Sequence, residues 1–358
     1  MITRLLVHRR RLRLARPFVT AIRRAEHLDV TLVEARDDTG RSGWGEAAVS
    51  WRVTGESPES VTAVVDGALA EAVLMRDPAD PDLPGIITGA VWGNAAARSA
   101  VECAALDLAA QRADRSLSAA LGAGTLAVYT DMTLSAASIE ETESAAVTAV
   151  ERGFGTIKLK ADRSTDLVPL LRAVRSAVGD DVRIRIDANQ AWSVDDAIDR
   201  LRAAESAGMP IELVEQPVPA ADLAGLAAVR AGVGIPVLAD EAVRTEDDLD
   251  RVLTLGAADA VNLKLAKSGG PTAALRLASR ARDAGLGVLV GCMLESAVGV
   301  AASAAVAAAC APEGVHDLDG GLWLIGSPVV GGAHYDEDRI ILSPRPGLGI
   351  AAIAEGAE

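Results

Sequence analysis

The sequence contains few aromatic residues and few cysteines. Phe, Trp and Tyr make up 3% of the 358 residues, so the core must be built mainly from Ala, Val, Leu and Ile. The three cysteines, Cys103, Cys292 and Cys310, stand at irregular spacing and match neither a disulfide framework nor a zinc-binding pattern. Cysteines without such a pattern are typical of a reducing compartment, and we therefore expect a cytoplasmic protein.

Long apolar runs, a secretion signal and a basic surface are missing as well. The longest apolar stretch, residues 297–311, is dominated by alanine and too short to cross a bilayer, so we interpret it as a helix packed on a sheet. The N-terminus lacks the apolar stretch and the cleavage site of a signal peptide. The net charge of -15 argues against nucleic acid or an anionic membrane as a partner. We expect a small-molecule substrate and a homo-oligomer.

The first third of the chain has the pattern of an α+β unit. Residues 5–49 alternate between apolar and polar side chains as strands do, with turn-forming residues near 37–43. Helical periodicity follows over residues 57–75 and 89–112. Because this unit differs from the pattern that comes after it, we predict an α+β capping domain over residues 1–122.

From about residue 127, strands and helices alternate, as in an α/β fold. The predicted strands cover 127–133, 155–160 and 182–187 and then end near Glu215, Asp240, Lys264, Gly291 and Asp317. The predicted helices include 135–152, 164–178, 193–207, 220–231, 271–284 and 296–311. Eight strands with seven intervening helices predict a modified TIM barrel, (β/α)7β, over residues 123–330. Residues 331–358 have no place in this count, and we expect this tail to return to the capping domain and complete it.

Charged residues recur at the ends of the predicted strands. Lys160, Asp187, Glu215, Asp240 and Lys264 follow one another at intervals of 27, 28, 25 and 24 residues. Each interval has the length of one strand, one helix and two loops. Because successive strand ends converge at one mouth of such a barrel, we expect these side chains to meet where barrel enzymes carry their active site.

The lysines of Lys158-Leu-Lys160 are two residues apart on a strand, so both point to one side, here the barrel interior. Their mutual repulsion and partial burial should lower the pKa of at least one of them, which suits a base near neutral pH. Taken alone, such a pair is more often solvated on an edge strand. The acids at the next three strand ends favour the catalytic interpretation, and Lys264 then provides a second base across the barrel mouth.

Asp187, Glu215 and Asp240 supply three carboxylates from three adjacent strand ends. Oxygen ligands of this kind suit Mg2+, with water or substrate completing an octahedron. Each acid by itself would more often cap a helix or form a salt bridge, but three in register after the lysine pair make that interpretation improbable. We predict one Mg2+ ion in the active site, flanked by two bases.

These residues stand in the order found in a known family. The motifs are Lys158-Leu-Lys160, Asp187-Ala-Asn189, Glu215-Gln-Pro, Ala-Asp240-Glu241, Lys264-Leu-Ala-Lys-Ser-Gly-Gly and Gly43-Trp44-Gly45-Glu46-Ala47. With them the chain resembles, over essentially its whole length, the muconate-lactonizing subgroup of the enolase superfamily. The resemblance implies removal of a proton α to a carboxylate and stabilisation of the enediolate on Mg2+. It implies Lys160 and Lys264 as the acid/base pair, with Lys158 tuning Lys160 and contacting the substrate carboxylate.

Four further residues are expected near the metal site and the two bases. Lys267 lies one helical turn beyond Lys264 and is its rival as the second base; Lys264 is preferred because it falls at the strand end. Asn189, Glu241 and Glu295 are expected to support the ligands and the substrate-binding residues from behind.

The residues after the last strand, Asp317-Leu-Asp319, distinguish between activities in the subgroup. Two carboxylates on one face form a site for a cation and suit a wholly anionic substrate poorly. The pair resembles that of the dipeptide epimerases, in which it binds the α-ammonium of the N-terminal residue. The resemblance therefore implies an isomerase that inverts the C-terminal residue of a dipeptide, L-Ala-D/L-Glu, by two-lysine 1,1-proton transfer. An N-acylamino-acid racemase or o-succinylbenzoate synthase, which need no such pair, and a non-catalytic metal-binding barrel are the alternatives.

The other candidates for substrate contact are also implied by the resemblance. Residues 16–24 resemble the specificity loop of L-Ala-D/L-Glu epimerases, in which an arginine at the position of Arg23 meets the glutamate side chain. A solvated basic turn is the alternative interpretation of this segment. Residues 51–56 are expected to form a second covering loop. Thr133 and Cys292 stand at strand ends that contact substrate in such enzymes.

Overall fold

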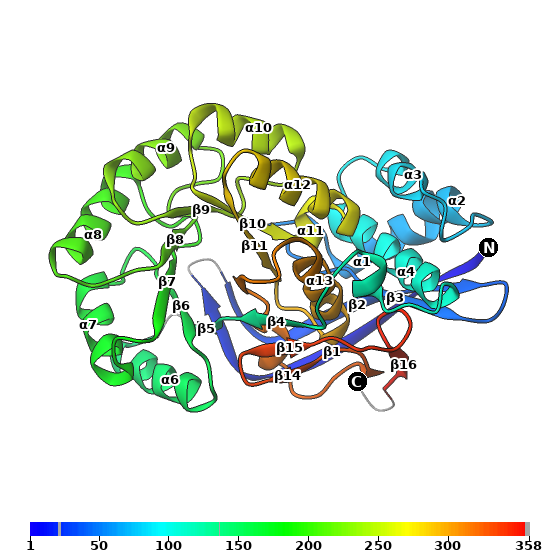
Figure 1. Ribbon diagram of the computed structural model, residues 1–358, viewed down its shortest axis with the longest axis horizontal. Helices are drawn as coiled ribbons and strands as arrows, with labels where there is room; N and C mark the ends of the chain where they lie inside the picture. Colours follow the sequence, from blue (N-terminus) through cyan, green and yellow to red (C-terminus); the bar gives the residue numbers. More distant parts are fainter. Residues whose placement is uncertain (21–22, 136, 355–358) are drawn as a thin grey trace.

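The computed structural model describes residues 1–20, 23–135 and 137–354, without the side chains of Thr20 and Arg23. A ring of parallel strands and helices fills the left of the view, and an α+β cap lies at the right (Figure 1). This arrangement confirms the predicted fold class, an α/β barrel with an N-terminal capping unit.

The cap consists of a small antiparallel sheet covered by helices. The strands, in the order β1-β2-β3, are β1 (Ile2–Thr20), β2 (Arg23–Asp37) and β3 (Ser42–Glu46). The helices are α1 (Pro58–Val64), the π-helical turn η1 (Val65–Leu69), α2 (Ala70–Val73), α3 (Leu83–Ala90), α4 (Ala95–Arg112) and α5 (Leu117–Ala120). The helix predicted over 57–75 thus contains a π-helical turn in its middle.

The motif around Trp44 has a packing reason. Strand β3 lies directly on helix α4, and a Cβ atom added at Gly43 would stand 2.2 Å from the carbonyl oxygen of Ala104. At Gly45 the distance to the carbonyl oxygen of Ala100 would be 2.0 Å. Only glycine allows a strand backbone to approach a helix this closely.

The helix predicted over 89–112 is wrong at its start, because α4 begins only at Ala95. Gly93 and Asn94, just before it, have φ angles of 67° and 48°. This left-handed conformation interrupts a right-handed helix. The Glu56 carboxylate caps the new start by accepting hydrogen bonds from two of the free N–H groups of α4.

Among the described residues, eight strand positions form the barrel. They are β4 (Ala127–Thr130) with β5 (Met132–Leu134), β6 (Thr156–Lys160), β7 (Arg183–Asp187), β8 (Leu213–Glu215), β9 (Val237–Ala239), β10 (Ala260–Lys264), β11 (Gly287–Gly291) and β12 (Val315–His316). Strands β5 to β11 pair in chain order. Strand β12 closes the ring, because it pairs with β4 and meets β11 through the bridge between Gly291 and Asp317.

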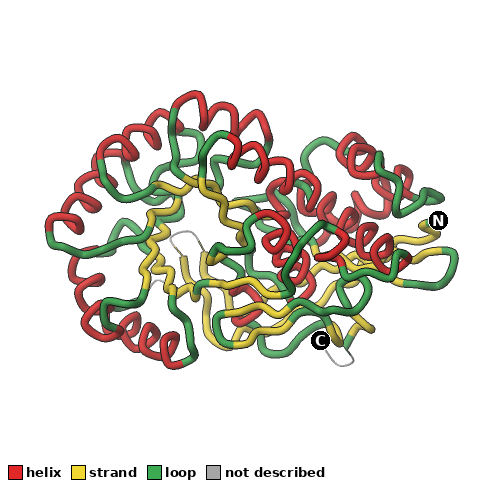
Figure 2. Tube along the Cα trace, viewed as in Figure 1, coloured by secondary structure: helices red, strands yellow, loops and turns green. Residues whose placement is uncertain are grey.

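In the described part of the chain, seven helices connect these strands, and Figure 2 shows helices around the outside of the ring of strands. They are α6 (Ile139–Glu151), α7 (Leu167–Val178), α8 (Val194–Ser206), α9 (Leu223–Gly232), α10 (Glu246–Leu255), α12 (Pro271–Asp283) and α13 (Ala297–Cys310). A short extra helix, α11 (Leu265–Ser268), follows β10 directly. The predicted (β/α)7β order is therefore confirmed. Helix α6 begins later than predicted, because Ser138 and Glu141 form a capping box there.

The strand predicted over 127–133 is two short strands, because Asp131 interrupts it. Strand β4 pairs with β12, whereas β5 pairs with β6. The N–H group of Asp131 donates to the carbonyl oxygen of His316, and its side chain is fully buried. The kink lets one chain segment join both edges of the sheet, which closes the barrel.

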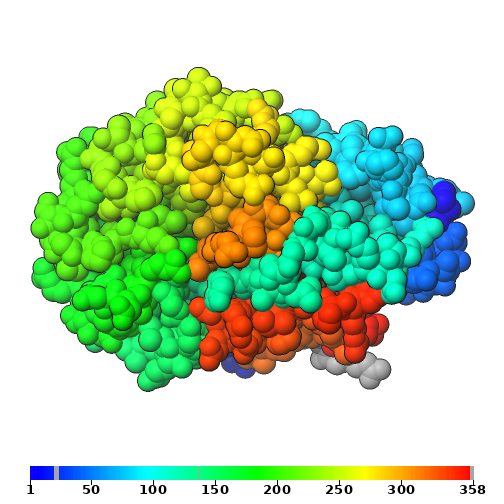
Figure 3. Space-filling model, in the orientation of Figure 1, coloured from blue at the N-terminus to red at the C-terminus, as the bar shows by residue number. Residues whose placement is uncertain are grey.

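The C-terminal tail contacts both parts of the molecule. Its strands are β13 (Val329–Gly331), β14 (His334–Asp336), β15 (Arg339–Ile341) and β16 (Ile350–Ile353). The Gly347 N–H donates to the carbonyl oxygen of Arg115, and the Leu348 N–H donates to Asp107 of α4, so the tail does meet the cap. Strand β15, however, pairs with barrel strand β4, which was not predicted. In Figure 3 the red C-terminal segment lies along the lower margin of the molecule, below the teal segment. The domain boundaries at residues 122 and 330 stay a prediction.

Aliphatic side chains and alanine supply most of the core, as the composition predicts. One cluster fills the barrel and the space under its helices, and a second lies between the cap sheet and α4. Helix α13, the alanine-rich stretch, is almost entirely buried. No helix in the described part of the chain is long and apolar enough to cross a membrane.

Candidate active site at the mouth of the barrel

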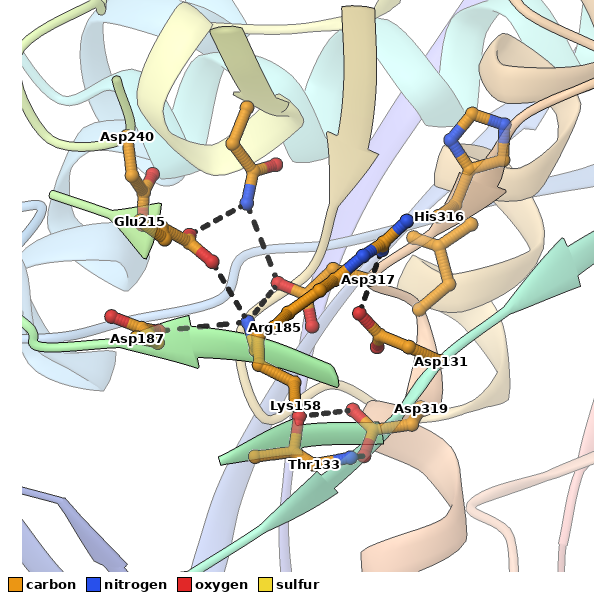
Figure 4. A network of polar contacts seen from close by, with 12 residues as sticks. Asp131, Thr133, Lys158, Arg185, Asp187, Glu215, Asp240, His316, Asp317 and Asp319 are labelled. Atoms are coloured by element: carbon orange, nitrogen blue, oxygen red, sulfur yellow. Dashed lines mark hydrogen bonds and ion pairs between the residues drawn. The ribbon is translucent and has the colours of Figure 1, made fainter. Parts of the chain in front are cut away.

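The charged strand ends lie together at the mouth of the barrel. Lys160 and Asp187 are partners across β6 and β7, and Asp187 and Glu215 are partners across β7 and β8. Asp240 directly follows β9, and Lys264 is the last residue of β10. Because the strands are parallel, their carboxyl ends place these side chains around one opening. Figure 4 shows the three acids Asp187, Glu215 and Asp240.

Lys158 lies at the centre of this layer. Its Nζ lies 2.7 Å from Asp317, 3.2 Å from Glu215 and 3.5 Å from Asp187 (Figure 4). Burial lowers the pKa of Lys158, but these carboxylates outweigh burial and hold the pKa well above its ordinary value. The predicted lowering by repulsion from Lys160 is therefore wrong for Lys158, because the neighbouring carboxylates outnumber the neighbouring ammonium groups.

Lys160 and Lys264 lie on opposite sides of the acidic layer. The Lys160 Nζ is 2.5 Å from Asp187, and the Lys264 Nζ is 2.8 Å from Asp240. Strands β7, β8 and β9 separate the two strands that carry these lysines. Both side chains line the same cavity, so a ligand held above the carboxylates has one amine on each side.

Lys267 occupies a different environment from Lys264. Its ammonium group donates to the side chain and the carbonyl oxygen of Asp240 and, at 3.0 Å, to the carbonyl oxygen of Asn262. A lysine has three N–H donors, so all of them are used. Burial lowers the pKa of Lys267, yet its side chain does not line the cavity. The geometry thus supports Lys264 as the base and Lys267 as a support of Asp240.

The oxygen atoms and the negative charge of these acids suit a divalent cation. Burial, then repulsion from Asp187, raises the pKa of Glu215 to about 7, and burial, then repulsion from Asp240, raises that of Glu241 to about 8. Two buried oxygens beside this centre, Asn189 Oδ1 and Glu241 Oε2, have no hydrogen-bond partner. An excess of negative charge and unpaired oxygens is what a bound Mg2+ would relieve.

The acids are nevertheless not closed around one point. Within the described residues, no three side chains of His, Cys, Asp or Glu converge as a metal-binding group. Instead Asp187 and Asp240 each pair with two lysines, and Glu215 accepts a hydrogen bond from Lys158 and, at 2.8 Å, another from Asn262. Each carboxylate has about four lone-pair sites, so Mg2+ could bind at sites that the ammonium groups leave free.

Asp317 and Asp319 follow β12 and point into the same cavity. Burial raises the pKa of Asp317, but Lys158 and Lys264 outweigh burial and lower the pKa to about 2. Asp319 accepts a hydrogen bond from the Thr133 N–H at 2.7 Å. Burial, followed by repulsion from Asp317, raises the pKa of Asp319. The two acids are thus close enough to repel, as a cation-binding pair would be.

The cavity over these residues has a volume of about 350 Å³ and is lined in part by the cap. The cap contributes the following lining residues: Phe18, Leu28, Asp29, Val49, Ser50, Trp51, Arg52, Val53, Glu56, Ser57 and Pro58. Residues 51–53 thus cover the site as the sequence predicts. Arg23 begins β2, but its side chain lies outside the described residues, and its contact with a substrate stays a prediction.

Cys292 and Glu295 lie in the loop after β11. Cys292 lines the cavity, and burial together with nearby carboxylates raises the pKa of its thiol well above the ordinary value. Glu295 does not line the cavity; it accepts a hydrogen bond from the Met293 N–H at 2.9 Å. Burial, then repulsion from Glu46, raises its pKa to about 8. Its position is that of a supporting residue.

Sequence reasoning missed an aromatic wall and a lower charged layer. Trp323 lines the cavity beside the acid pair. The only feature of the sequence that could have drawn attention to it is that aromatic residues are rare in this chain. Below Lys158, Arg185 donates to Asp131 at 2.8 Å (Figure 4) and, on its other side, to Glu212 at 2.6 Å. Arg185 stands two residues before Asp187 on β7, so strand alternation could have shown that it also points inward.

The comparison with family models agrees with this architecture. Residues 2–122 match the mandelate racemase/muconate lactonizing enzyme N-terminal domain, and residues 141–355 match the enolase C-terminal domain-like family. The chain therefore belongs to the mandelate racemase/muconate lactonizing branch of the enolase superfamily.

Individual relatives are similar over their whole length. The chain is 39% identical to the L-Ala-D/L-Glu epimerase of Clostridium acetobutylicum, over 95% of this chain and 96% of that one. The structure matches a substrate-liganded complex of the L-Ala-D/L-Glu epimerase from Bacillus subtilis with a TM-score of 0.95 and 35% identity, covering 99% of both chains. A dipeptide epimerase from Enterococcus faecalis, complexed with Mg and L-Leu-L-Tyr, matches with a TM-score of 0.93 and 31% identity, over 98% of this chain and 99% of that one.

Proposed function

We propose that the protein is a Mg2+-dependent dipeptide epimerase that inverts the α-carbon of the C-terminal residue of L-Ala-D/L-Glu. Two features of one cavity carry the proposal: Lys160 and Lys264 lie on opposite sides of a layer of buried acids, and the pair Asp317 and Asp319 lies beside them. The first arrangement serves proton transfer on two faces, and the second serves a free amine. The relatives that epimerise or bind dipeptides support the same activity.

The acids and Lys158 would hold the reacting end of the substrate. Asp187, Glu215 and Asp240 would bind Mg2+, which supplies positive charge to the terminal carboxylate of the dipeptide and makes its α-proton more acidic. Lys158, which lines the cavity, would donate hydrogen bonds to the same carboxylate. Two points of attachment fix the α-carbon between the two remaining lysines.

Proton transfer then uses one lysine on each face. The neutral amine of Lys160 or Lys264 accepts the α-proton and becomes an ammonium group, while the ammonium group opposite donates a proton to the other face of the carbon. The configuration is inverted, and the two lysines have exchanged protonation states. Cap residues line the cavity and would limit the access of water to the carbon during the transfer.

The amino end of the substrate would lie at the acid pair. The α-ammonium of the N-terminal residue carries three N–H donors, and Asp317 and Asp319 present carboxylate oxygens on one side of the cavity. Charge-assisted hydrogen bonds of this kind are about twice as strong as neutral ones. An N-acylated substrate has no such ammonium, so the acid pair favours a dipeptide over an N-acylamino acid.

The proposal is tested by incubating the protein with Mg2+ and a dipeptide library in deuterium oxide and measuring deuterium at the α-carbon by mass spectrometry. We expect incorporation into both epimers of L-Ala-Glu and none in a Lys160→Ala, Lys264→Ala double variant. Incorporation confined to N-acyl or N-succinyl amino acids would identify a racemase instead. No incorporation into any compound would leave a metal-binding barrel without this activity.

Two expectations about the protein in the cell belong to the same proposal. A cytoplasmic location is supported by Cys103, Cys292 and Cys310, which are all buried and free. Light scattering on the purified protein tests the expected homo-oligomer, and a monomeric mass would contradict it.

A further inference from the structure

Trp323 connects the acid pair to the cap. It ends the short 3-10 helix η2 (Asp319–Trp323) and is 1% exposed. Its indole Nε1–H donates to Oδ2 of Asp319 at 3.2 Å. The same oxygen accepts the Thr133 N–H at 2.7 Å, whereas Oδ1 has only a 3.4 Å contact with the Thr133 hydroxyl. The carboxylate is thus held at one oxygen, and the other is left for a ligand.

The other side of the indole ring is covered by the first strand of the cap. The ring of Phe18 meets that of Trp323 edge-on, with centroids 4.8 Å apart and planes at 88°. The Arg16 guanidinium lies 4.5 Å from the centre of a Trp323 ring. Edge-to-face and cation–π contacts of this geometry are both attractive. Residues 16 and 18 belong to the segment interpreted from sequence as a specificity loop.

Backbone pairing holds the same two segments together. Leu14 of β1 forms an antiparallel bridge with Leu324, and the Ile325 N–H donates to the carbonyl oxygen of Arg13 at 2.9 Å. The cap strand is therefore joined to the chain on the C-terminal side of Trp323, while the indole N–H reaches back to the acid pair. A displacement of residues 13–18 would move the ring and, through it, the donor to Asp319.

We propose that Trp323 is a positioning residue, which holds the carboxylate of Asp319 in the orientation that binds the free amine of the substrate. Through Trp323, the geometry of this amine-binding site also depends on the position of the first cap strand, β1. The inference rests on the proposed function, because it assigns an α-ammonium to the acid pair. Trp323 itself need not touch the reacting carbon. Its effect should therefore appear in the recognition of the amine and not in the proton transfer.

The test measures how strongly the Mg2+-loaded protein prefers L-Ala-L-Glu over its N-acetyl derivative, by calorimetric titration with each ligand. Trp323→Phe keeps an aromatic ring against Phe18 and Arg16 and removes only the N–H donor and part of the ring. We expect the preference for the free amine to fall about tenfold, the size of one lost hydrogen bond to a charged group. In an Asp319→Asn background, the same change at Trp323 should alter the preference less than about twofold, because the two residues act as one unit.

Trp192 provides a matched control. It is 1% exposed, its Nε1–H donates to a backbone carbonyl oxygen, that of Asp162, and an arginine lies over its ring, but it does not line the cavity. Trp192→Phe should lower stability much as Trp323→Phe does and leave the preference for the free amine unchanged. Equal affinity of the unmodified protein for both ligands would overturn the proposed function and this inference with it. A strong preference that Trp323→Phe leaves intact would overturn only the role of Trp323.

Discussion

Lys264 and Lys267 lie within one helical turn, yet the structure predicts different consequences for their removal. Lys264→Ala takes away an amine that lines the cavity, while Asp240 keeps its contact with Lys267. The protein should fold, and it should lose proton transfer on one face of the substrate. One epimer would then still exchange its α-proton with solvent through Lys160, and the other would not.

Lys267→Met should instead act on the fold. All three N–H donors of Lys267 are used inside the protein, and its partner Asp240 is 2% exposed. Removing one member of a buried ion pair costs about 3–5 kcal/mol, because the other charge stays buried. Lys264 remains 2.8 Å from Asp240 and compensates part of this cost, so we expect about 3 kcal/mol.

Two measurements separate the lysines. Chemical denaturation gives the free energy of unfolding, and proton NMR in deuterium oxide gives the α-proton exchange rate of each epimer. We expect Lys267→Met to lower stability and to reduce both exchange rates by the same factor. If Lys267→Met were as stable as the unmodified protein and lost exchange of one epimer only, while Lys264→Ala epimerised normally, Lys267 would be the base and the argument from its hydrogen bonds would fail.

Three other predictions follow from the same structure. Chelation of Mg2+ should abolish epimerisation and added Mg2+ should restore it, whereas Asp240→Asn should not be restored; undiminished turnover after exhaustive chelation would refute a metal-assisted reaction. Arg23→Ala should lower kcat/KM for L-Ala-Glu much more than for a dipeptide ending in an apolar residue, and equal losses would make Arg23 structural. Burial lowers the pKa of His316 to about 4 from 6.5, and its Nδ1 accepts the Val290 N–H. The unfolded chain therefore binds a proton at His316 more readily than the folded protein does. About 3 kcal/mol of folding stability, present above pH 6.5, should be lost as the pH falls toward 4. His316→Gln should make the free energy of unfolding less dependent on pH in this range.

The positions of the site residues were predictable because parallel strands have a simple geometry. Once Lys160, Asp187, Glu215 and Asp240 were assigned to successive strand ends, their meeting at one mouth followed without any knowledge of side-chain packing. The predicted order of strands and helices was correct for the same reason. Errors occurred where a single residue interrupts a pattern, as Asp131 does within a predicted strand and Gly93 does before helix α4.

The ionisation of the site could not be predicted in the same way. Sequence spacing placed Lys158 beside Lys160 and suggested repulsion, but the pKa depends on every charge within a few ångströms. Asp317, which lies 2.7 Å from Lys158, is 159 residues away in the sequence, and no periodic pattern reveals that distance. Trp323 was missed for a related reason, because its contacts with the cap do not follow from the sequence of the short helix that carries it.

The cap contacts the residues around the active site of the barrel at more than one point. Besides its contact with Trp323, it sends Glu46 from the end of β3 to the start of α13, where the buried carboxylate accepts hydrogen bonds from the N–H groups of Ser296 and Gly299, each at 3.0 Å. These N–H groups have no partner within their own helix, and the positive end of the helix dipole favours a carboxylate there. The loop that carries Cys292 ends at this helix, so the cap fixes one wall of the cavity from behind while covering it from above. A barrel without its cap would therefore lose the order of the amine subsite and of this wall together, although every charged strand end would still be present.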